Sequence, residues 1–337
     1  MQTNQYYLIA FVLLTVAFII SLILTRVMRD IAIRLQIIDR PSSDVKTHTI
    51  PVPYMGGIAM LLTIIPTLLI AGYFISAGYP FFSILFSIAF LSIMGFVDDL
   101  RGLTPWTRFA GQTFVALLMV SVGIRLEIVY FPTELNIALT IIWIVGITNA
   151  LNIIDIMDGL AGGVALIAGA VFLFVALPAP QPEILILSAT LIGAVGGFLV
   201  HNYSGKIYMG DSGSYLLGFM LSIIAIREQF TAENSLALLS PVLILGIPIY
   251  DTFLVMILRI RKRKNPFHGS RDHFALRLEV LGIPRKYVVI MIWLISVTLG
   301  QAAFIMTRLN IWGAAFAYIL IAIVACTVAK KISMVDM

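Results

Sequence analysis

The chain has 337 residues, of which 60% are hydrophobic and 12% are charged, and its mean hydropathy is +1.03. An ordinary soluble domain is about 25% charged, and no soluble core could bury so much apolar surface, so the composition places most of the chain in a lipid bilayer. The net charge of +5 needs no nucleic-acid partner, because the basic residues gather in the loops between apolar runs. The single cysteine, Cys326, cannot form an internal disulfide.

The apolar runs predict an all-α, polytopic membrane bundle of about eleven transmembrane helices. The first run is interpreted as a retained span, because residues 1–7 lack the basic residues of a cleavable signal peptide. Two runs, 136–150 and 213–226, are shorter than a full crossing, which suggests a polar site sunk into the membrane surface beside them. The expected spans are 6–24, 58–76, 81–97, 109–124, 136–150, 160–177, 184–200, 213–226, 236–258, 287–307 and 311–329.

The loops between these spans divide sharply by charge. One side carries 19 of the 22 lysines and arginines, and the other side keeps only Arg125, Arg227 and Arg308. By the positive-inside rule the basic side is cytoplasmic, which puts the N-terminus outside and the C-terminus inside. We therefore expect one integral-membrane domain over 1–337, with cytoplasmic loops near 26–57, 98–108, 149–159, 201–213 and 259–286.

Acidic residues lie beside the membrane at three places. Asp98 and Asp99 are expected at a helix C-terminus, where the helix dipole disfavours anions, so they either cap an exposed helix or hold a cation or a proton. Asn152, Asp155 and Asp158 recur every three residues, would share one face if helical, and have no lysine or arginine in their loop. Unpaired carboxylates in an apolar environment need a metal or a ligand's donors; the alternative is a water-exposed polar turn.

The third acidic place is Asp211, which lies between two glycines and is either a helix N-cap or part of a site. The expected cytoplasmic loops also carry groups suited to phosphate, namely Lys46, His48, Arg271 and His273. The alternative interpretation is that these residues belong to a solvated loop whose basic residues contact anionic lipid. Phosphoryl transfer needs this mixture, because acids hold Mg²⁺ and bases neutralise phosphate oxygens.

In its motifs and their order, the chain resembles the polyprenyl-phosphate N-acetylhexosamine-1-phosphate transferases, glycosyltransferase family 4, which include the lipid I translocase. The resemblance covers most of the chain. Its motifs are Asp39…Lys46-x-His48…Pro53-x-x-Gly56-Gly57, Asp98-Asp99…Arg108-x-x-Gly111-Gln112, Asn152-x-x-Asp155-x-x-Asp158-Gly159, Met209-Gly210-Asp211-Ser212-Gly213-Ser214, Gly246-Ile247-Pro248-Ile249-Tyr250-Asp251-Thr252 and Asp272-His273.

The resemblance implies a role for each matching residue. Asp211 and Asn152 would bind the metal, Mg²⁺ with Mn²⁺ as the alternative. Asp98 and Asp99 would lie at the reacting phosphates, with Asp98 taking the proton of the lipid phosphate. The remaining expected substrate contacts are Asp155 and Asp158 near the metal and uracil, Tyr208 stacked on uracil, and Lys46, His48, Arg108, Arg271 and His273 at the phosphates or sugar. Asp251 matches a motif without a clear role, and pairing with an arginine or a site lysine is the first hypothesis.

Two departures from the family pattern bear on the substrate. Arg108 stands where the family usually has lysine, and only the first histidine, His273, of a His-x-His-His pattern is present. The first-loop spacing is similar to the N-acetylglucosamine-1-phosphate branch, so the resemblance implies UDP-N-acetylglucosamine, or a close UDP-N-acetylhexosamine, as the donor. The implied acceptor is undecaprenyl phosphate in a bacterial inner membrane, with a cytoplasmic active site. The sequence does not fix the oligomeric state, and a homodimer is one alternative. For the function, the alternative is a secondary transporter.

Overall fold

The structure is a computed structural model that describes residues 3–39, 51–178, 181–228, 235–263 and 272–335. The described part is mostly helical, which confirms the all-α membrane bundle, and its only strands are the two short β-strands below. The chain forms two compact units, residues 1–228 and 229–337. The expected single membrane domain over 1–337 stays a prediction.

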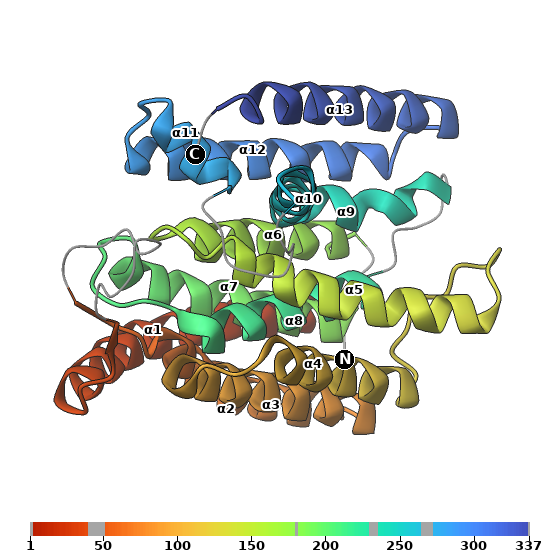
Figure 1. Ribbon diagram of the computed structural model, residues 1–337. Coiled ribbons are helices and arrows are strands. Elements are labelled where there is room, and N and C mark those ends of the chain that lie inside the picture. Colours follow the sequence, from red (N-terminus) through yellow and green to blue (C-terminus); the bar gives the residue numbers. More distant parts are fainter. Residues whose placement is uncertain (1–2, 40–50, 179–180, 229–234, 264–271, 336–337) are drawn as a thin grey trace. The chain divides into compact units, whose positions relative to one another are not determined.

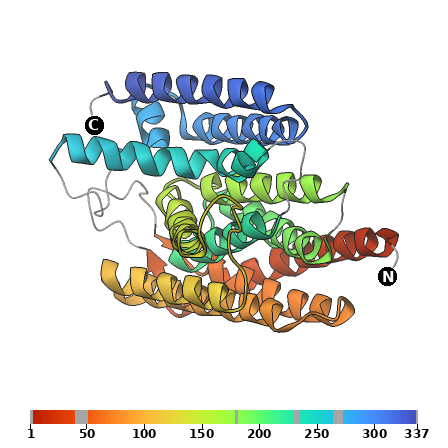
Figure 2. The same cartoon turned by 90° about the vertical axis from the view of Figure 1, so that its right-hand side faces the viewer.

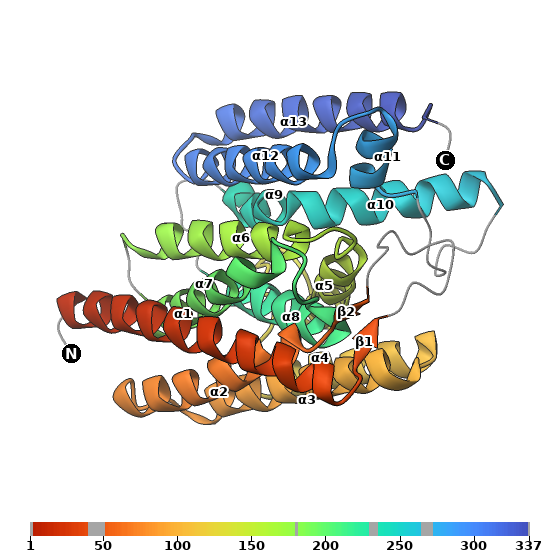
Figure 3. The same ribbon diagram turned by 90° about the vertical axis from the view of Figure 1, so that its left-hand side faces the viewer.

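The described residues of the first unit form eight helices and one short pair of strands (Figure 1). Its helices are α1 (Thr3–Arg34), α2 (Gly56–Phe74), α3 (Tyr79–Arg101), α4 (Pro105–Ser121), α5 (Thr133–Ile153), α6 (Leu160–Ala176), α7 (Pro182–Asn202) and α8 (Gly210–Arg227). Strands β1 (Ile38–Asp39) and β2 (Val52–Pro53) pair antiparallel next to the C-terminal end of α1 (Figure 3).

Helix α8 is the core of the first unit. It is buried on nearly every side and contacts α2, α3, α5, α6 and α7. Small residues allow these close contacts, because a Cβ at Gly95 of α3 would overlap the backbone of Asp211, and one at Gly218 would meet the backbone of α5. The first turn of α8 is therefore held against the last turn of α3.

The second unit contains η1 (Ser235–Leu239), α9 (Ser240–Ile244), α10 (Gly246–Arg261), α11 (Phe274–Val280), α12 (Arg285–Met306) and α13 (Ile311–Ile332). Figure 2 shows α12 and α13 side by side. Helices α9 and α10 are bent by 74° relative to each other. Pro248 lies in the first turn of α10, where a proline costs no helical hydrogen bond.

Seven helices of the described chain are long and apolar enough to cross a membrane, or up to eight if the bent pair α9–α10 is one span. The other three expected spans coincide with α4, α6 and α8, which are shorter or more polar. The prediction of a short span at 136–150 was wrong, because α5 runs over 21 residues. Its polar residues stay helical because they have partners on other helices: Asn149 donates to Gln112 of α4, and Asn152 to Asp211 of α8.

Candidate active site

Asp98 lies in the last turn of α3 and is 3% exposed. Its Oδ1 accepts hydrogen bonds from the Leu103 N–H at 2.7 Å and from Arg108 Nη2 at 2.9 Å. Its Oδ2 is 2.7 Å from Arg108 Nε and accepts the Tyr215 hydroxyl at 3.1 Å. Only the Nη2 contact is a hydrogen bond, and the Nε contact is a close ion pair without hydrogen-bond geometry. Arg108, at the start of α4, therefore offsets the charge of Asp98 at a helix end that disfavours anions.

Asp99, the next residue, has a different partner. Its carboxylate accepts the backbone N–H of Asp211 at 2.9 Å and that of Ser212 at 3.3 Å. Asp99 therefore caps the N-terminus of α8 from another helix, where the helix dipole favours an anion. Gly210 precedes this turn with a φ of +72°, and a Cβ there would meet the Asp99 carboxylate, so glycine is required at this position.

Asn152 joins the end of α5 to the first turn of α8. Its side-chain amide donates to Asp211 Oδ1 at 2.6 Å and to Ser214 Oγ at 2.9 Å. The two residues expected to bind metal, Asn152 and Asp211, are therefore adjacent although 59 positions separate them in the chain.

Asn152, Asp155 and Asp158 do not share one helical face, as they would if the whole stretch were helical. Helix α5 ends at Ile153, and residues 154–159 form turns. Gly159, with a φ of +78°, ends this segment, and its N–H donates to Asn202 Oδ1 at 2.8 Å. Asn202 also donates to the Ile207 carbonyl, so this buried side chain connects the 154–159 turn to the loop before α8.

The turn still brings the two carboxylates to Asp211. Burial raises the pKa of the Asp155 carboxyl to about 8, and the carboxylates of Asp211 and Asp158 add to the effect. Asp158 lies against Gly205, since a Cβ there would be 3.2 Å from its Oδ2. Asp155 and Asp158 therefore belong to the same acidic cluster as Asp98, Asp99 and Asp211.

Tyr208 is half-buried in the segment that leads into α8. Its N–H donates to the Pro53 carbonyl at 2.8 Å, and its own carbonyl accepts the Gly56 N–H at 3.0 Å. The Gly57 N–H donates to the Met209 carbonyl at 2.9 Å. The prolines and glycines of the first loop thus fix the backbone that carries Tyr208 and Asp211.

This acidic cluster (Asp98, Asp99, Asp155, Asp158 and Asp211) fits a hard divalent cation by its chemistry. Asp211 is electrostatically coupled to Asp98, Asp99 and Asp155. Carboxylate and amide oxygens are the ligands that Mg²⁺ takes. Among the described residues, however, no three histidine, cysteine or acidic side chains are arranged as ligands of one ion. A metal here would therefore use few protein ligands, and Mg²⁺ commonly binds through one or two carboxylates together with substrate phosphates.

His273 lies in the second unit, directly before α11. Its Nδ1 is 2.8 Å from Asp251 Oδ2 on α10, and the next N–H, that of Phe274, donates to Asp251 Oδ1 at 2.6 Å. The hypothesis that Asp251 pairs with an arginine or a site lysine was therefore wrong. Asp272 takes those partners instead, contacting Lys262 at 2.6 Å and Arg277 at 2.7 Å. Lys46, His48 and Arg271 lie outside the described residues.

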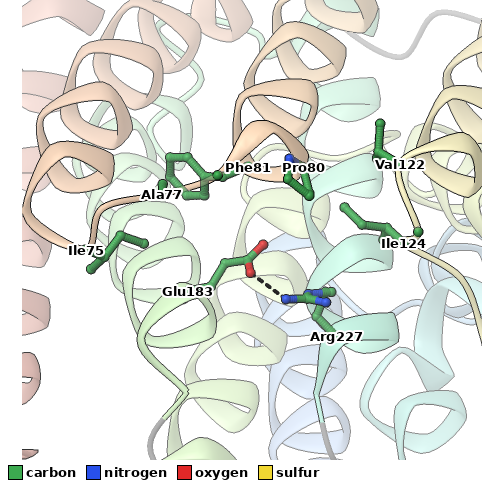
Figure 4. Close-up of a pocket in the computed structure, with 10 residues that line it drawn as sticks. Ile75, Ala77, Pro80, Phe81, Val122, Ile124, Glu183 and Arg227 are labelled. Carbon is green, nitrogen blue, oxygen red and sulfur yellow. Dashed lines mark hydrogen bonds and ion pairs between the residues drawn. The ribbon is translucent and has the colours of Figure 1, made fainter.

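A cavity of about 250 Å³ lies at the other end of the first unit (Figure 4). It is lined by the connection from α2 to α3 and by the residues after α4. Glu183 of α7 and Arg227 of α8 face each other there, with 2.7 Å between Glu183 Oε2 and Arg227 Nη2. Helix α3 starts at this cavity and ends at the acidic cluster, and its 23 residues are about 34 Å long. The cavity is therefore separate from the cluster.

The chain is similar in sequence to known proteins. Residues 81–229, from α3 to the end of α8, match the family model for glycosyl transferase family 4. The chain is 32% identical to the probable undecaprenyl-phosphate N-acetylglucosaminyl 1-phosphate transferase of Bacillus subtilis, over 96% of this chain and 93% of the relative. It is 33% identical to the decaprenyl-phosphate N-acetylglucosaminephosphotransferase of Mycobacterium tuberculosis, over 88% and 82%.

The chain belongs to glycosyltransferase family 4. Another relative, the phospho-N-acetylmuramoyl-pentapeptide-transferase of Halalkalibacterium halodurans, is 32% identical over 77% of this chain and 84% of its own. These relatives are named as transferases, which disfavours the secondary-transporter alternative.

Two site residues of this family 4 protein were missed by the sequence reasoning. Tyr215 is fully buried and donates to Asp98, and Asn202 anchors the turn that carries Asp158. Tyr215 stands four positions after Asp211, so the two lie one helical turn apart, and that spacing was the available signal. Asn202 follows an apolar run and carried no signal, because its partners are backbone groups of other segments.

Proposed function

We propose that the protein transfers N-acetylglucosamine 1-phosphate from UDP-N-acetylglucosamine to undecaprenyl phosphate and releases UMP. This would be the first membrane step of a cell-envelope polysaccharide. The observation that supports it most is the convergence of five carboxylates on the first turn of α8, with Arg108 beside them. The names of the B. subtilis and M. tuberculosis relatives supply the substrate class.

The roles follow from these contacts. Asp211 and Asn152 would hold Mg²⁺, which neutralises phosphate charge when bound. Asp99 fixes the first turn of α8 and so positions Asp211. Asp155 and Asp158 complete the acidic surface around the nucleotide, and Tyr208 offers its ring to the uracil. Lys46, His48, Arg271 and His273 keep their expected phosphate or sugar contacts as part of this proposal.

The role of Asp98 is the point where geometry and family resemblance differ. The resemblance makes Asp98 the base for the lipid phosphate. Its two oxygens already accept hydrogen bonds from the Leu103 N–H, Arg108 Nη2 and the Tyr215 hydroxyl, so a substrate would have to displace Arg108 or Tyr215 to reach it. A phosphate monoester loses its second proton with a pKa near 6 and is largely a dianion at pH 7. We therefore assign Asp98 to holding Arg108 and favour direct attack by the lipid phosphate.

The proposed orientation puts the acidic cluster at the cytoplasmic face of a bacterial inner membrane, with the N-terminus outside and eleven spans. In the described first unit, six of the eight lysines and arginines lie at the cluster end, and only Arg125 and Arg227 lie at the other end. The six are Arg26, Arg29, Arg34, Arg101, Arg108 and Lys206. This asymmetry supports the orientation through the positive-inside rule.

The test is UMP release by the purified protein with undecaprenyl phosphate, Mg²⁺ and a panel of UDP-sugars. The panel contains UDP-N-acetylglucosamine, UDP-N-acetylgalactosamine and the UDP-muramyl pentapeptide. We expect UMP with the first donor, only when the lipid is present, and none after chelation of the metal. Release with the pentapeptide donor alone would move the chain to the lipid I branch, and no release with any donor would contradict the proposal.

A further inference from the structure

The contact between Asp251 and His273 has no place in the proposed roles so far. Their side chains are 5% and 8% exposed, so water competes little for their hydrogen bond. Each oxygen of Asp251 has its own partner, the imidazole Nδ1 on Oδ2 and the Phe274 N–H on Oδ1. The carboxylate therefore fixes both the ring and the backbone that follows it.

The segment around His273 is anchored on its other side as well. Asp272 binds Lys262 and Arg277. The fully buried Arg277 also donates to the carbonyl of Ile332 at the end of α13 and to that of Val335 beyond it. The charge of Asp272 is thus taken by two cations, whereas Asp251 contacts the imidazole itself. The backbone of His273 is held from α10, α11 and the C-terminal segment, so its ring can be oriented by a single hydrogen bond.

The contact with the Asp251 carboxylate determines which nitrogen of the His273 ring carries the proton. An ionised carboxylate only accepts hydrogen bonds, so Nδ1 must carry a proton. Nε2 is then the nitrogen that faces a substrate: an imidazole nitrogen accepts a hydrogen bond in the neutral ring and donates one to an anion in the imidazolium form. Carboxylates orient metal-bound histidines in the same way, and removing such a carboxylate commonly lowers metal affinity or activity about 10- to 100-fold.

We propose that Asp251 is a positioning residue: it holds His273 through Nδ1–H, so that Nε2 is the nitrogen that contacts an anionic phosphate group of the substrate. This rests on the proposed function, in which His273 takes a phosphate or sugar contact.

The test uses Asp251→Asn in the full-length protein. Asparagine keeps an oxygen for the Phe274 N–H but turns an N–H toward Nδ1, so the backbone contact survives and the ring contact is inverted. We expect kcat/KM to fall about 10- to 100-fold. In a His273→Gln background the same change should cost less than about twofold, because coupled residues are not additive. An equal loss in both backgrounds would show that Asp251 is merely structural and would overturn the proposal.

A second readout measures the ring directly. The chain has four histidines, so ¹⁵N-histidine labelling with a His273→Gln reference assigns the signal. We expect protonated Nδ1 in the wild type and protonated Nε2 in Asp251→Asn, and an unchanged tautomer would overturn the proposal. Glu279→Gln, which breaks the half-buried pair with Arg285, is the charge-loss control that should change neither readout. If the wild type transfers nothing, the proposed function fails, and the tautomer alone decides whether Asp251 orients His273.

Discussion

Adjacent residues of the acidic cluster have different tasks. Asp98 binds Arg108 and Tyr215, whereas Asp99 caps α8. The pattern Asp98-Asp99 predicted a helix end and a need for a counter-charge, and both are present. It could not predict which of the two would meet Arg108, because that depends on how α4 turns back after Gly102, which has a φ of +67°.

Asp211 is the carboxylate that we propose as a ligand of the metal. Asp211→Asn keeps the shape of the side chain and removes the charge that a hard cation needs. We expect turnover to fall more than about 100-fold, in line with the loss of a main electrostatic contribution to catalysis. The measurement is UMP release at saturating Mg²⁺, with gel filtration in detergent to confirm folding. Turnover near that of the wild type would remove Asp211 from the metal site.

Tyr208 is the residue that we propose stacks on the uracil of the nucleotide. Base–aromatic stacking is worth about 1–3 kcal/mol, so Tyr208→Ala should weaken UDP-sugar binding roughly 5- to 150-fold. Tyr208→Phe is the matched control, since it keeps the ring and should retain most of the affinity. Titration calorimetry with UDP-N-acetylglucosamine measures both. Equal losses in the two variants would assign the effect to the hydroxyl, and no loss in either would leave Tyr208 a packing residue.

Among the elements, the helices were predictable because a bilayer imposes one length and one polarity on them. The apolar runs located the long membrane helices, but they gave the bent pair α9–α10 as one span at 236–258 and placed α11 in a loop. The extent of α5 was not predictable, since Asn149 and Asn152 read as the end of a span until their partners on α4 and α8 are known. The sequence left a helix and a turn open at 154–159, because the spacing of three suits both.

The contact between α3 and α8 gives a prediction at this scale. Gly95→Ala places a methyl group on the backbone of Asp211 and should cost about 1–3 kcal/mol by overpacking, while also lowering activity through displacement of Asp211. Gly146→Ala in α5 is the control, because a Cβ there meets nothing within 4 Å. It should be neutral or gain about 0.5–1 kcal/mol.

Thermal unfolding in detergent compares these two variants. A Gly95→Ala protein as stable and active as Gly146→Ala would show that the close approach of α3 and α8 is unnecessary.

For the whole molecule, the central structural claim is orientation. In a Cys326→Ser background, we expect an impermeant thiol reagent to modify Val129→Cys from outside and to reach Thr104→Cys only after the membrane is opened. Both positions are exposed, and they flank the two ends of α4. The reverse labelling pattern would invert the orientation and place the acidic cluster on the outer face.

The measurement that tests the account most directly is the identity of the lipid product. The protein is incubated with undecaprenyl phosphate, Mg²⁺ and UDP-N-acetylglucosamine labelled with ³²P at the β-phosphate, and the lipid is analysed by mass spectrometry and autoradiography. We predict undecaprenyl-pyrophosphoryl-N-acetylglucosamine that carries the label, formed by the wild type and not by Asp211→Asn. A lipid without the label, or a labelled lipid made equally well by Asp211→Asn, would contradict sugar-phosphate transfer at the acidic cluster.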